Sequence, residues 1–319
     1  MPDIVPIIDI APLLAGSEAG LKSVAAEIGQ VAREVGFFYV ANHGVPSPLV
    51  TEVFAWMALY FAQPLAEKQQ LSYKNSKSNT GYFAIGDEYL DSVLAADAKE
   101  AFQINRDIAA DDPDFLAGKP FHAPNQWPAE MPRFRAVMLD YFAIQKKICE
   151  RLHRAFAIDL GLEADFFAPY IDKPLATLRL LHYPPHPGAF DGSRYGASPH
   201  TDFGNLTILA QDDAGGLEVR TRAGDWIAAR PIADTFLCNI GDCLMRWSND
   251  TYISTPHRVV NRSGRDRYSA AFFHDPNYDA PVACLPTCTD ETHPPRYPAT
   301  TGGEYLTQKL EEAFGYAGA

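Results

Sequence analysis

The chain has 319 residues, of which 47% are apolar and 21% are charged. This composition predicts one large globular domain, or one domain with additions, and it argues against a disordered chain. The formal net charge is −13, and no run of Lys and Arg stands out. A protein that binds a phosphate backbone needs a basic face. Nucleic acid is therefore not an expected partner.

Cysteine usage and the N-terminal residues predict a cytoplasmic protein. Residues 1–16 have no basic region, so they do not resemble a signal peptide, and no apolar run in the sequence is as long as a membrane span. The cysteines are odd in number and form no Cys-x-x-Cys pair, which favours free thiols in a reducing compartment. The five cysteines are Cys149, Cys238, Cys243, Cys284 and Cys288.

The first half of the chain mixes helical and extended patterns. Between residues 130 and 160, apolar side chains recur at intervals near three, four and seven, which is the spacing of one buried helix face. Two shorter helices and three strands are expected before it. The helices are predicted at 21–35 and 47–62, the strands at 5–10, 36–46 and 97–105, and a polar loop at 72–82.

Beyond residue 162 the pattern changes to short β-rich runs separated by Gly, Pro, Asn and Asp. Strands are predicted at 177–184, 205–211, 216–221, 225–230, 235–240, 256–261 and 267–273, and a last helix at 302–316. Many short strands with regular turns favour an antiparallel sandwich or jelly roll. We expect an α+β protein with a mainly β core. Residues 1–125 would form an N-terminal helical region and 126–319 the core, as one compact unit.

Three residues could hold a metal ion. His200 and Asp202 flank Thr201 beside a predicted strand, and alternate residues of an extended segment point the same way. His257 begins another predicted strand, 55 residues after Asp202. Two histidines and one carboxylate form the facial triad that leaves three positions of Fe(II) open for O2 chemistry. Because a His-x-Asp triplet is common by chance, it predicts a metal site only when other residues of the chain fit the same site.

A second group of residues could bind carboxylates. Arg267 and Ser269 share one face of the strand predicted at 267–273, whose apolar neighbours indicate burial, and a buried Arg needs an anion. Phe273 continues this face and could wall a substrate pocket, whereas His274 points away. On the strand at 177–184, Tyr183 could bind the same carboxylate and Arg179 a second anion, on the substrate.

These motifs, taken in order, resemble the isopenicillin N synthase-like branch of the Fe(II)/2-oxoglutarate oxygenases. The resemblance covers nearly the whole chain. It is carried by VPIIDI, GFFYVANHGVP, PLAEK and NTGYF in the first half, and by LRLLHYP, HTDFGNLTIL, GDCLMRWSND, STPHRVVN, RYS and GGEYL in the second. The chain departs from many plant members at Leu181, where they carry Asn, and FFHDPNYDA is closer to bacterial and fungal members.

The resemblance implies a double-stranded β-helix with helices packed outside. It implies His200, Asp202 and His257 as Fe(II) ligands, with 2-oxoglutarate and O2 as cosubstrates. The distal carboxylate of 2-oxoglutarate would bind Arg267 and Ser269, with Tyr183 in support. The fold would also place Tyr82 and residues 99–105 near the pocket mouth, where a small-molecule substrate, anionic or neutral, enters. Hydroxylation, desaturation, cyclisation and ethylene formation all remain open.

Three other functions remain open at this point. An iron-dependent oxidase could place its own substrate's carboxylate on Arg267, because relatives such as isopenicillin N synthase carry Arg-x-Ser without using 2-oxoglutarate. A non-catalytic small-molecule-binding β-barrel would not need an intact triad. A zinc hydrolase could use the same ligands but would leave Arg267 and Ser269 unexplained. The sequence leaves the substrate open, together with the choice between a monomer and a small homo-oligomer.

Overall fold

The computed structural model describes residues 5–87, 96–185, 190, 192 and 194–314. Its helices match the three earlier predictions closely, and the last predicted helix is described as far as Phe314. Residues 315 and 316 of that prediction lie outside the described part of the chain. The helices are α1 (Ala11–Leu14), α2 (Glu18–Glu34), α3 (Ser47–Phe61), α4 (Leu65–Gln69), α5 (Pro113–Leu116), α6 (Pro132–Asp159), α7 (Asp242–Trp247) and α8 (Gly302–Phe314).

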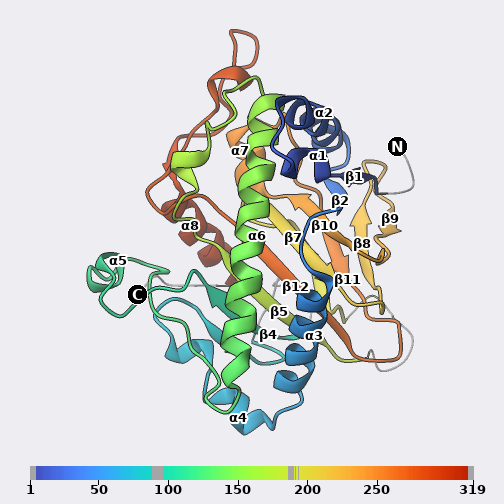
Figure 1. Cartoon of the computed structure of the whole chain (residues 1–319), viewed down its shortest axis with the longest axis vertical. Helices are drawn as coiled ribbons and strands as arrows, with labels where there is room; N and C mark the ends of the chain where they lie inside the picture. The colour runs from blue at the N-terminus through green and yellow to red at the C-terminus, as the bar shows by residue number, and fades with distance from the viewer. Residues whose placement is uncertain (1–4, 88–95, 186–189, 191, 193, 315–319) are drawn as a thin grey trace.

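Helix α6 is the long helix that the apolar spacing predicts. It crosses the front of the molecule, with strands behind it and α2 and α3 beside it (Figure 1). The residues at the predicted spacing, from Phe134 to Phe156, are buried. One of its aromatic rings, Phe142, packs edge-on against Phe272 at 4.9 Å. The helix therefore covers the outer face of the sheet, and the opposite face stays open for a site.

The described residues form a large sheet of eight strands, in the order β1-β2-β10-β7-β12-β5-β4-β3. Its first-half and second-half strands pair directly, so both regions of the chain contribute to one sheet. The strands are β1 (Ile7–Asp9), β2 (Phe37–Ala41), β3 (Gly81–Phe83), β4 (Glu100–Asn105), β5 (Thr177–Tyr183), β7 (Leu206–Gln211), β10 (Thr235–Ile240) and β12 (Arg267–His274).

A smaller sheet faces the large one and completes the core. Its order in the described residues is β6-β11-β8-β9. One group of buried side chains fills the space between the two sheets, and a second joins the large sheet to the helices. This arrangement confirms the expected α+β class with a double-stranded β-helix core. The strands are β6 (Ala197–His200), β8 (Leu217–Arg220), β9 (Trp226–Ala228) and β11 (His257–Val259), with β13 (Pro281–Val282) and β14 (Thr300–Thr301) forming a separate pair.

Several short elements of the described residues were not predicted from the sequence. The expected loop at 72–82 contains a 3-10 turn at Tyr73–Asn75 and the start of β3, which is a strand because it pairs with β4. Strand β6 and helix α7 are four and six residues long. Elements this short show no periodicity, so tertiary pairing decides them. None of the described helices has the length and apolar character needed to cross a membrane.

Candidate metal centre

Three side chains that could bind a metal converge between the two sheets. His200 ends β6 and His257 begins β11, and these residues pair across the two antiparallel strands. Asp202 follows two residues after His200, just beyond the strand, so the alternation assumed from the sequence does not position it. One ligand atom from each residue lies within 4.8 Å of the others. Cross-strand pairing therefore brings together residues that are 55 positions apart in the chain.

Hydrogen bonds turn both imidazole rings toward the carboxylate. The Nδ1–H of His200 donates to the carbonyl of Ser198 at 2.6 Å, and that of His257 donates to Thr255 at 3.2 Å. The Nε2 atoms then face Asp202 Oδ1, at 3.8 and 3.6 Å. Backbone carbonyls on Nδ1 leave Nε2 as the lone-pair nitrogen, which is the form that binds a metal.

The Asp202 carboxylate is fixed by its other oxygen. Oδ2 accepts hydrogen bonds from the hydroxyl of Thr207 at 2.5 Å and from the amide of Asn239 at 2.7 Å. Burial alone would raise the pKa of Asp202, but His257, His200 and these two donors outweigh it and lower that pKa. Sequence reasoning missed Thr207 and Asn239, although both lie on predicted strands. Their effect is to keep Asp202 ionised, with Oδ1 directed at the histidines.

The donor set fits an Fe(II) ion. Two imidazole nitrogens and one carboxylate oxygen are the ligands of mononuclear non-haem iron oxygenases, which keep the remaining positions open. Burial, followed by the charge of His257, lowers the pKa of His200, so this imidazole is neutral at physiological pH. A neutral imidazole and an ionised carboxylate are the protonation states that metal binding requires.

A further buried network holds the strand that carries His200. Asp97 Oδ1 accepts hydrogen bonds from the backbone amide of Ser198 at 2.9 Å and from its hydroxyl at 2.8 Å. The other oxygen, Oδ2, pairs with the ammonium of Lys99 at 2.5 Å. The side chains of both members of this ion pair are nearly inaccessible to solvent. Asp97 was not singled out from the sequence, whereas Lys99 begins the segment 99–105 that was expected near the pocket mouth, and it lines the cavity.

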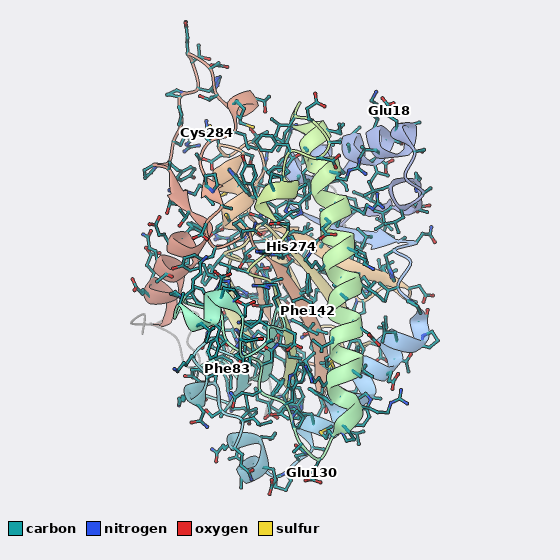
Figure 2. All side chains as sticks on the ribbon, turned by 60° about the vertical axis from the view of Figure 1, so that its left-hand side comes forward. Glu18, Phe83, Glu130, Phe142, His274 and Cys284 are labelled. Atoms are coloured by element: carbon teal, nitrogen blue, oxygen red, sulfur yellow. The ribbon has the colours of Figure 1, made fainter. Side chains whose placement is uncertain are left out.

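The triad opens onto a cavity of about 510 Å³ between the sheets. Most of the residues proposed from the sequence line this cavity. They are His200, Asp202, His257, Arg267, Ser269, Tyr183, Arg179 and Phe273. The alternation inferred for β5 and β12 is therefore correct, since each strand presents alternate residues to the cavity. As predicted, His274 points the other way, and Figure 2 shows it close to α6.

Arg267 is a fully buried cation, and its hydrogen-bond acceptors among the described residues are all neutral. Its Nε donates to the carbonyl of Gly215 at 2.6 Å, and its Nη atoms donate to Ser269 Oγ at 3.1 Å and Gln211 Oε1 at 3.3 Å. The guanidinium lies over the ring of Tyr183, 4.6 Å from its centre. Tyr183 thus offers its ring face to Arg267. A buried cation with neutral acceptors is electrostatically incomplete and favours an anion in the cavity.

Tyr82 does not lie where the sequence reasoning expected it. Its hydroxyl donates to Glu100 Oε2 at 2.5 Å, on the face of the large sheet away from the cavity. The neighbouring Phe83 lines the cavity instead, because alternate residues of β3 point to opposite faces. Figure 2 shows Phe83 well apart from α6. From the sequence, 72–82 was expected to be a loop, so it could not be assigned which residues of β3 face the cavity.

Two family models match the chain. The first, described as the N-terminal region of a non-haem dioxygenase in morphine synthesis, matches residues 5–130. The second, the 2OG-Fe(II) oxygenase superfamily, matches residues 174–276. The second range contains the three converging ligands and the Arg267–Ser269 pair. The two matches together cover most of the chain and agree with the family that the sequence resembles.

Similar proteins extend this agreement over the full length. The chain is 33% identical to the 2-oxoglutarate-Fe(II) type oxidoreductase hxnY of Emericella nidulans, covering 98% of this chain and 91% of that protein. It is 33% identical to a homoarginine-6-hydroxylase of Glycine max, covering 96% of each chain. The crystal structure of a full-length Neurospora crassa protein in complex with alpha-KG is similar, with a TM-score of 0.87 and 32% identity over 98% of this chain and 97% of that one. The chain belongs to the 2OG-Fe(II) oxygenase superfamily and is an Fe(II)- and 2-oxoglutarate-dependent oxidoreductase.

Proposed function

We propose that this enzyme is a dioxygenase that oxidises a small molecule at an iron ion held by His200, Asp202 and His257. The observation that carries the proposal is that these three ligands and the buried cation Arg267 open onto one cavity. Bound iron and 2-oxoglutarate would supply O2 activation coupled to decarboxylation, with succinate and CO2 as products. Hydroxylation, desaturation and related outcomes all use this chemistry.

The protein's own residues have distinct tasks in this proposal. The carbonyls of Ser198 and Thr255 hold each imidazole so that its Nε2 faces the metal. Thr207 and Asn239 hold the Asp202 carboxylate in the orientation that completes the set. Because these contacts exist before a ligand arrives, little reorganisation is needed on binding. No side chain has to act as a general base.

Arg267 and Ser269 are proposed to bind the distal carboxylate of 2-oxoglutarate. The guanidinium has fixed planar donors that suit a carboxylate, and the Ser269 hydroxyl lies beside it. Tyr183 supports the guanidinium with its ring face. Removing the partner of a buried hydrogen-bonded charge is costly, so a bound carboxylate would also stabilise this part of the fold.

The rest of the cavity is proposed to bind the primary substrate. Arg179 and Phe273 line it on the metal side of the large sheet. Solved structures of similar proteins contain small molecules: thymine in the Neurospora crassa protein, and JA in JOX2. We propose a small-molecule substrate here too. We also propose a cytoplasmic location, which the five free cysteines support.

The experiment that tests this function is anaerobic addition of Fe(II) and 2-oxoglutarate, followed by visible spectroscopy. Chelation of the iron by a keto acid produces a weak charge-transfer band. We expect this band for the wild type, and we expect Arg267→Gln to need at least about tenfold more 2-oxoglutarate, since a hydrogen bond to a charge contributes roughly 1.5–3 kcal/mol.

Arg265→Gln is the matched control, because Arg265 lies two positions before Arg267 and is an exposed residue that pairs with Asp213. It should leave the band unchanged. Measuring O2 consumption and succinate release during turnover distinguishes the proposed dioxygenase from the alternative oxidase. O2 consumption without release of succinate would indicate an oxidase whose own substrate binds Arg267.

A further inference from the structure

We infer that Asp97 is a positioning residue for the metal centre, because it holds the strand segment that orients the ring of His200. This inference rests on the proposed function, since it takes His200 to be a metal ligand. It assigns a task to a buried carboxylate that acts on this ligand through a third residue, Ser198.

The strand that carries His200 is short and irregular. Strand β6 has four residues and lies at the edge of the smaller sheet, where His200 pairs with His257 of β11. The next pair joins Ala197 to Val259, so three steps along β6 match two along β11. Such a bulge leaves one residue without its regular sheet hydrogen bonds. Pro199 lies inside it and has no N–H to donate. Strand β6 therefore depends on contacts from outside the sheet.

Asp97 supplies these contacts through Ser198, which lies in the bulge. Its Oδ1 accepts the backbone N–H of Ser198 at 2.9 Å and the hydroxyl of the same residue at 2.8 Å. The next residue, Ala98, adds a second link, because its backbone N–H donates to the carbonyl of Tyr195 at 2.8 Å. Residues 97 and 98 thus take the place of a neighbouring strand beside β6 and the residues before it.

Ser198 also holds the imidazole ring of His200. Its carbonyl accepts the Nδ1–H of His200 at 2.6 Å, while its N–H and its hydroxyl bind Asp97. The position of this carbonyl decides which ring nitrogen carries the proton and where the other nitrogen points. If Ser198 moved, Nε2 of His200 would no longer face Asp202. Asp97 therefore fixes the direction of a metal ligand by fixing Ser198.

Burial makes the contact between Asp97 and Ser198 strong and its loss costly. The Asp97 side chain has no exposed surface, and Ser198 is only 1% exposed. Oδ2 of Asp97 pairs with the ammonium of Lys99 at 2.5 Å, which compensates the buried negative charge. Because Lys99 holds Oδ2, Oδ1 stays directed at Ser198. A hydrogen bond to a charged group is stronger than a neutral one, and water does not replace it at a buried position.

The first test separates the acceptor oxygen of Asp97 from its charge. Two double variants, Asp97→Ala with Lys99→Met and Asp97→Asn with Lys99→Met, have the same net charge, but only the Asn variant keeps an oxygen that can accept from Ser198. Electron paramagnetic resonance measures their Mn(II) affinity. It should fall roughly tenfold in the Ala variant and stay within about threefold of the wild type in the Asn variant. Equal Mn(II) affinities of the two double variants would overturn the inference.

The second test observes the His200 ring directly, in metal-free protein that contains isotope-labelled histidine. The hydrogen-bonded Nδ1 proton of His200 should give a nuclear magnetic resonance signal that exchanges slowly with water, and His200→Gln identifies it by its loss. We expect the signal in the wild type and in the Asn variant, and its loss in the Ala variant, because the Ser198 carbonyl is no longer held. A signal that persists unchanged in the Ala variant would contradict a positioning role for Asp97.

Glu100→Gln is the matched control, because it changes another buried pair of a lysine and a carboxylate. Lys68 binds Glu100 at 2.7 Å, on the face of the large sheet away from the cavity. Glu100→Gln should lower the free energy of unfolding but keep the Mn(II) affinity and the His200 signal. An equal loss of Mn(II) affinity in this control would reduce the effect of Asp97 to general stability and overturn the inference. Normal Mn(II) binding by His200→Gln would instead contradict the proposed function.

Discussion

Single hydrogen bonds decide how Asp202 faces the metal. Thr207 and Asn239 both bind Oδ2 and leave Oδ1 for the metal. We predict that Thr207→Val and Asn239→Leu each lower Mn(II) affinity by about 10- to 100-fold, as is typical for partners of metal ligands. Mn(II) titration followed by electron paramagnetic resonance measures this. Thr235→Val on the same strand as Asn239 is the control, because its hydroxyl binds only the carbonyl of Ile232; an equal loss there would refute the assignment.

The close contact between Gly204 and a buried carboxyl group can also be tested by substitution. A Cβ at this position would lie 1.5 Å from Asp275 Oδ1. We predict that Gly204→Ala lowers the free energy of unfolding by about 1–3 kcal/mol through overpacking. Urea unfolding measures the loss. The double variant Gly204→Ala, Asp275→Ala should recover part of it, since the clashing atoms are gone; strictly additive losses would count against this contact.

The face on which an individual residue lies could be predicted where the strand that carries it was recognised, because side chains alternate along a strand. Arg267, Ser269 and Phe273 were placed together on one face from alternation alone, and the structure agrees. Tyr82 was misplaced because the short strand that carries it was expected to be a loop. Thr207 and Asn239 were missed for another reason: their role depends on where Asp202 lies in three dimensions, and a Thr or Asn on a buried strand gives no sign of that.

At the scale of elements, a charge network joins β4, β5 and α4 on the helix side of the large sheet. Glu100 accepts hydrogen bonds from Lys68 at 2.7 Å, from Tyr82 and from His182 at 2.7 Å. The other ring nitrogen of His182 lies 2.9 Å from Asp266. Burial alone would lower the pKa of His182, but Glu100 and Asp266 prevail and raise it above the usual 6.5. Folding therefore favours the charged imidazole.

This raised pKa predicts a pH-dependent stability. The stabilisation by charged His182 is fully present below pH 6.5, and it is lost as the pH rises through the raised folded-state pKa. His182→Gln should therefore lower the free energy of unfolding more at pH 5.5 than at pH 9.5, by roughly 1–2 kcal/mol. Urea unfolding at both pH values is the measurement. His293→Gln, at an exposed His–Asp pair, should show little change; a His182→Gln effect independent of pH would contradict the prediction.

Long elements were predictable and short ones were not. The apolar stripe of α6 extends over 28 residues, so its period was clear. Strand β6 has only four residues, Ala197–His200, and no internal pattern, yet it positions one metal ligand. It is a strand because β11 pairs with it. Helix α7 also depends on a contact with a distant part of the chain, since its first residue, Asp242, donates its backbone N–H to the carbonyl of Asp202.

At the scale of the whole molecule, the two faces of the large sheet have different tasks. Helix α6 packs on the outer face (Figure 1). The inner face forms the cavity with the smaller sheet. Most of the strands and their order along the chain could be predicted, together with the fold class. The spatial order could not be derived from local patterns, because β10 lies between β2 and β7 through contacts between distant parts of the chain.

The central claim is that one metal ion is held by side chains that two paired strands and the following loop bring together. Anaerobic Fe(II) binding by the wild type and by Asp202→Ala tests it most directly, with Asp213→Ala at an exposed ion pair as the control. We predict one ion per chain and a 2-oxoglutarate-dependent band for the wild type and the control, and loss of both for Asp202→Ala. An Asp202→Ala enzyme that binds Fe(II) normally and decarboxylates 2-oxoglutarate at the full rate would contradict the account.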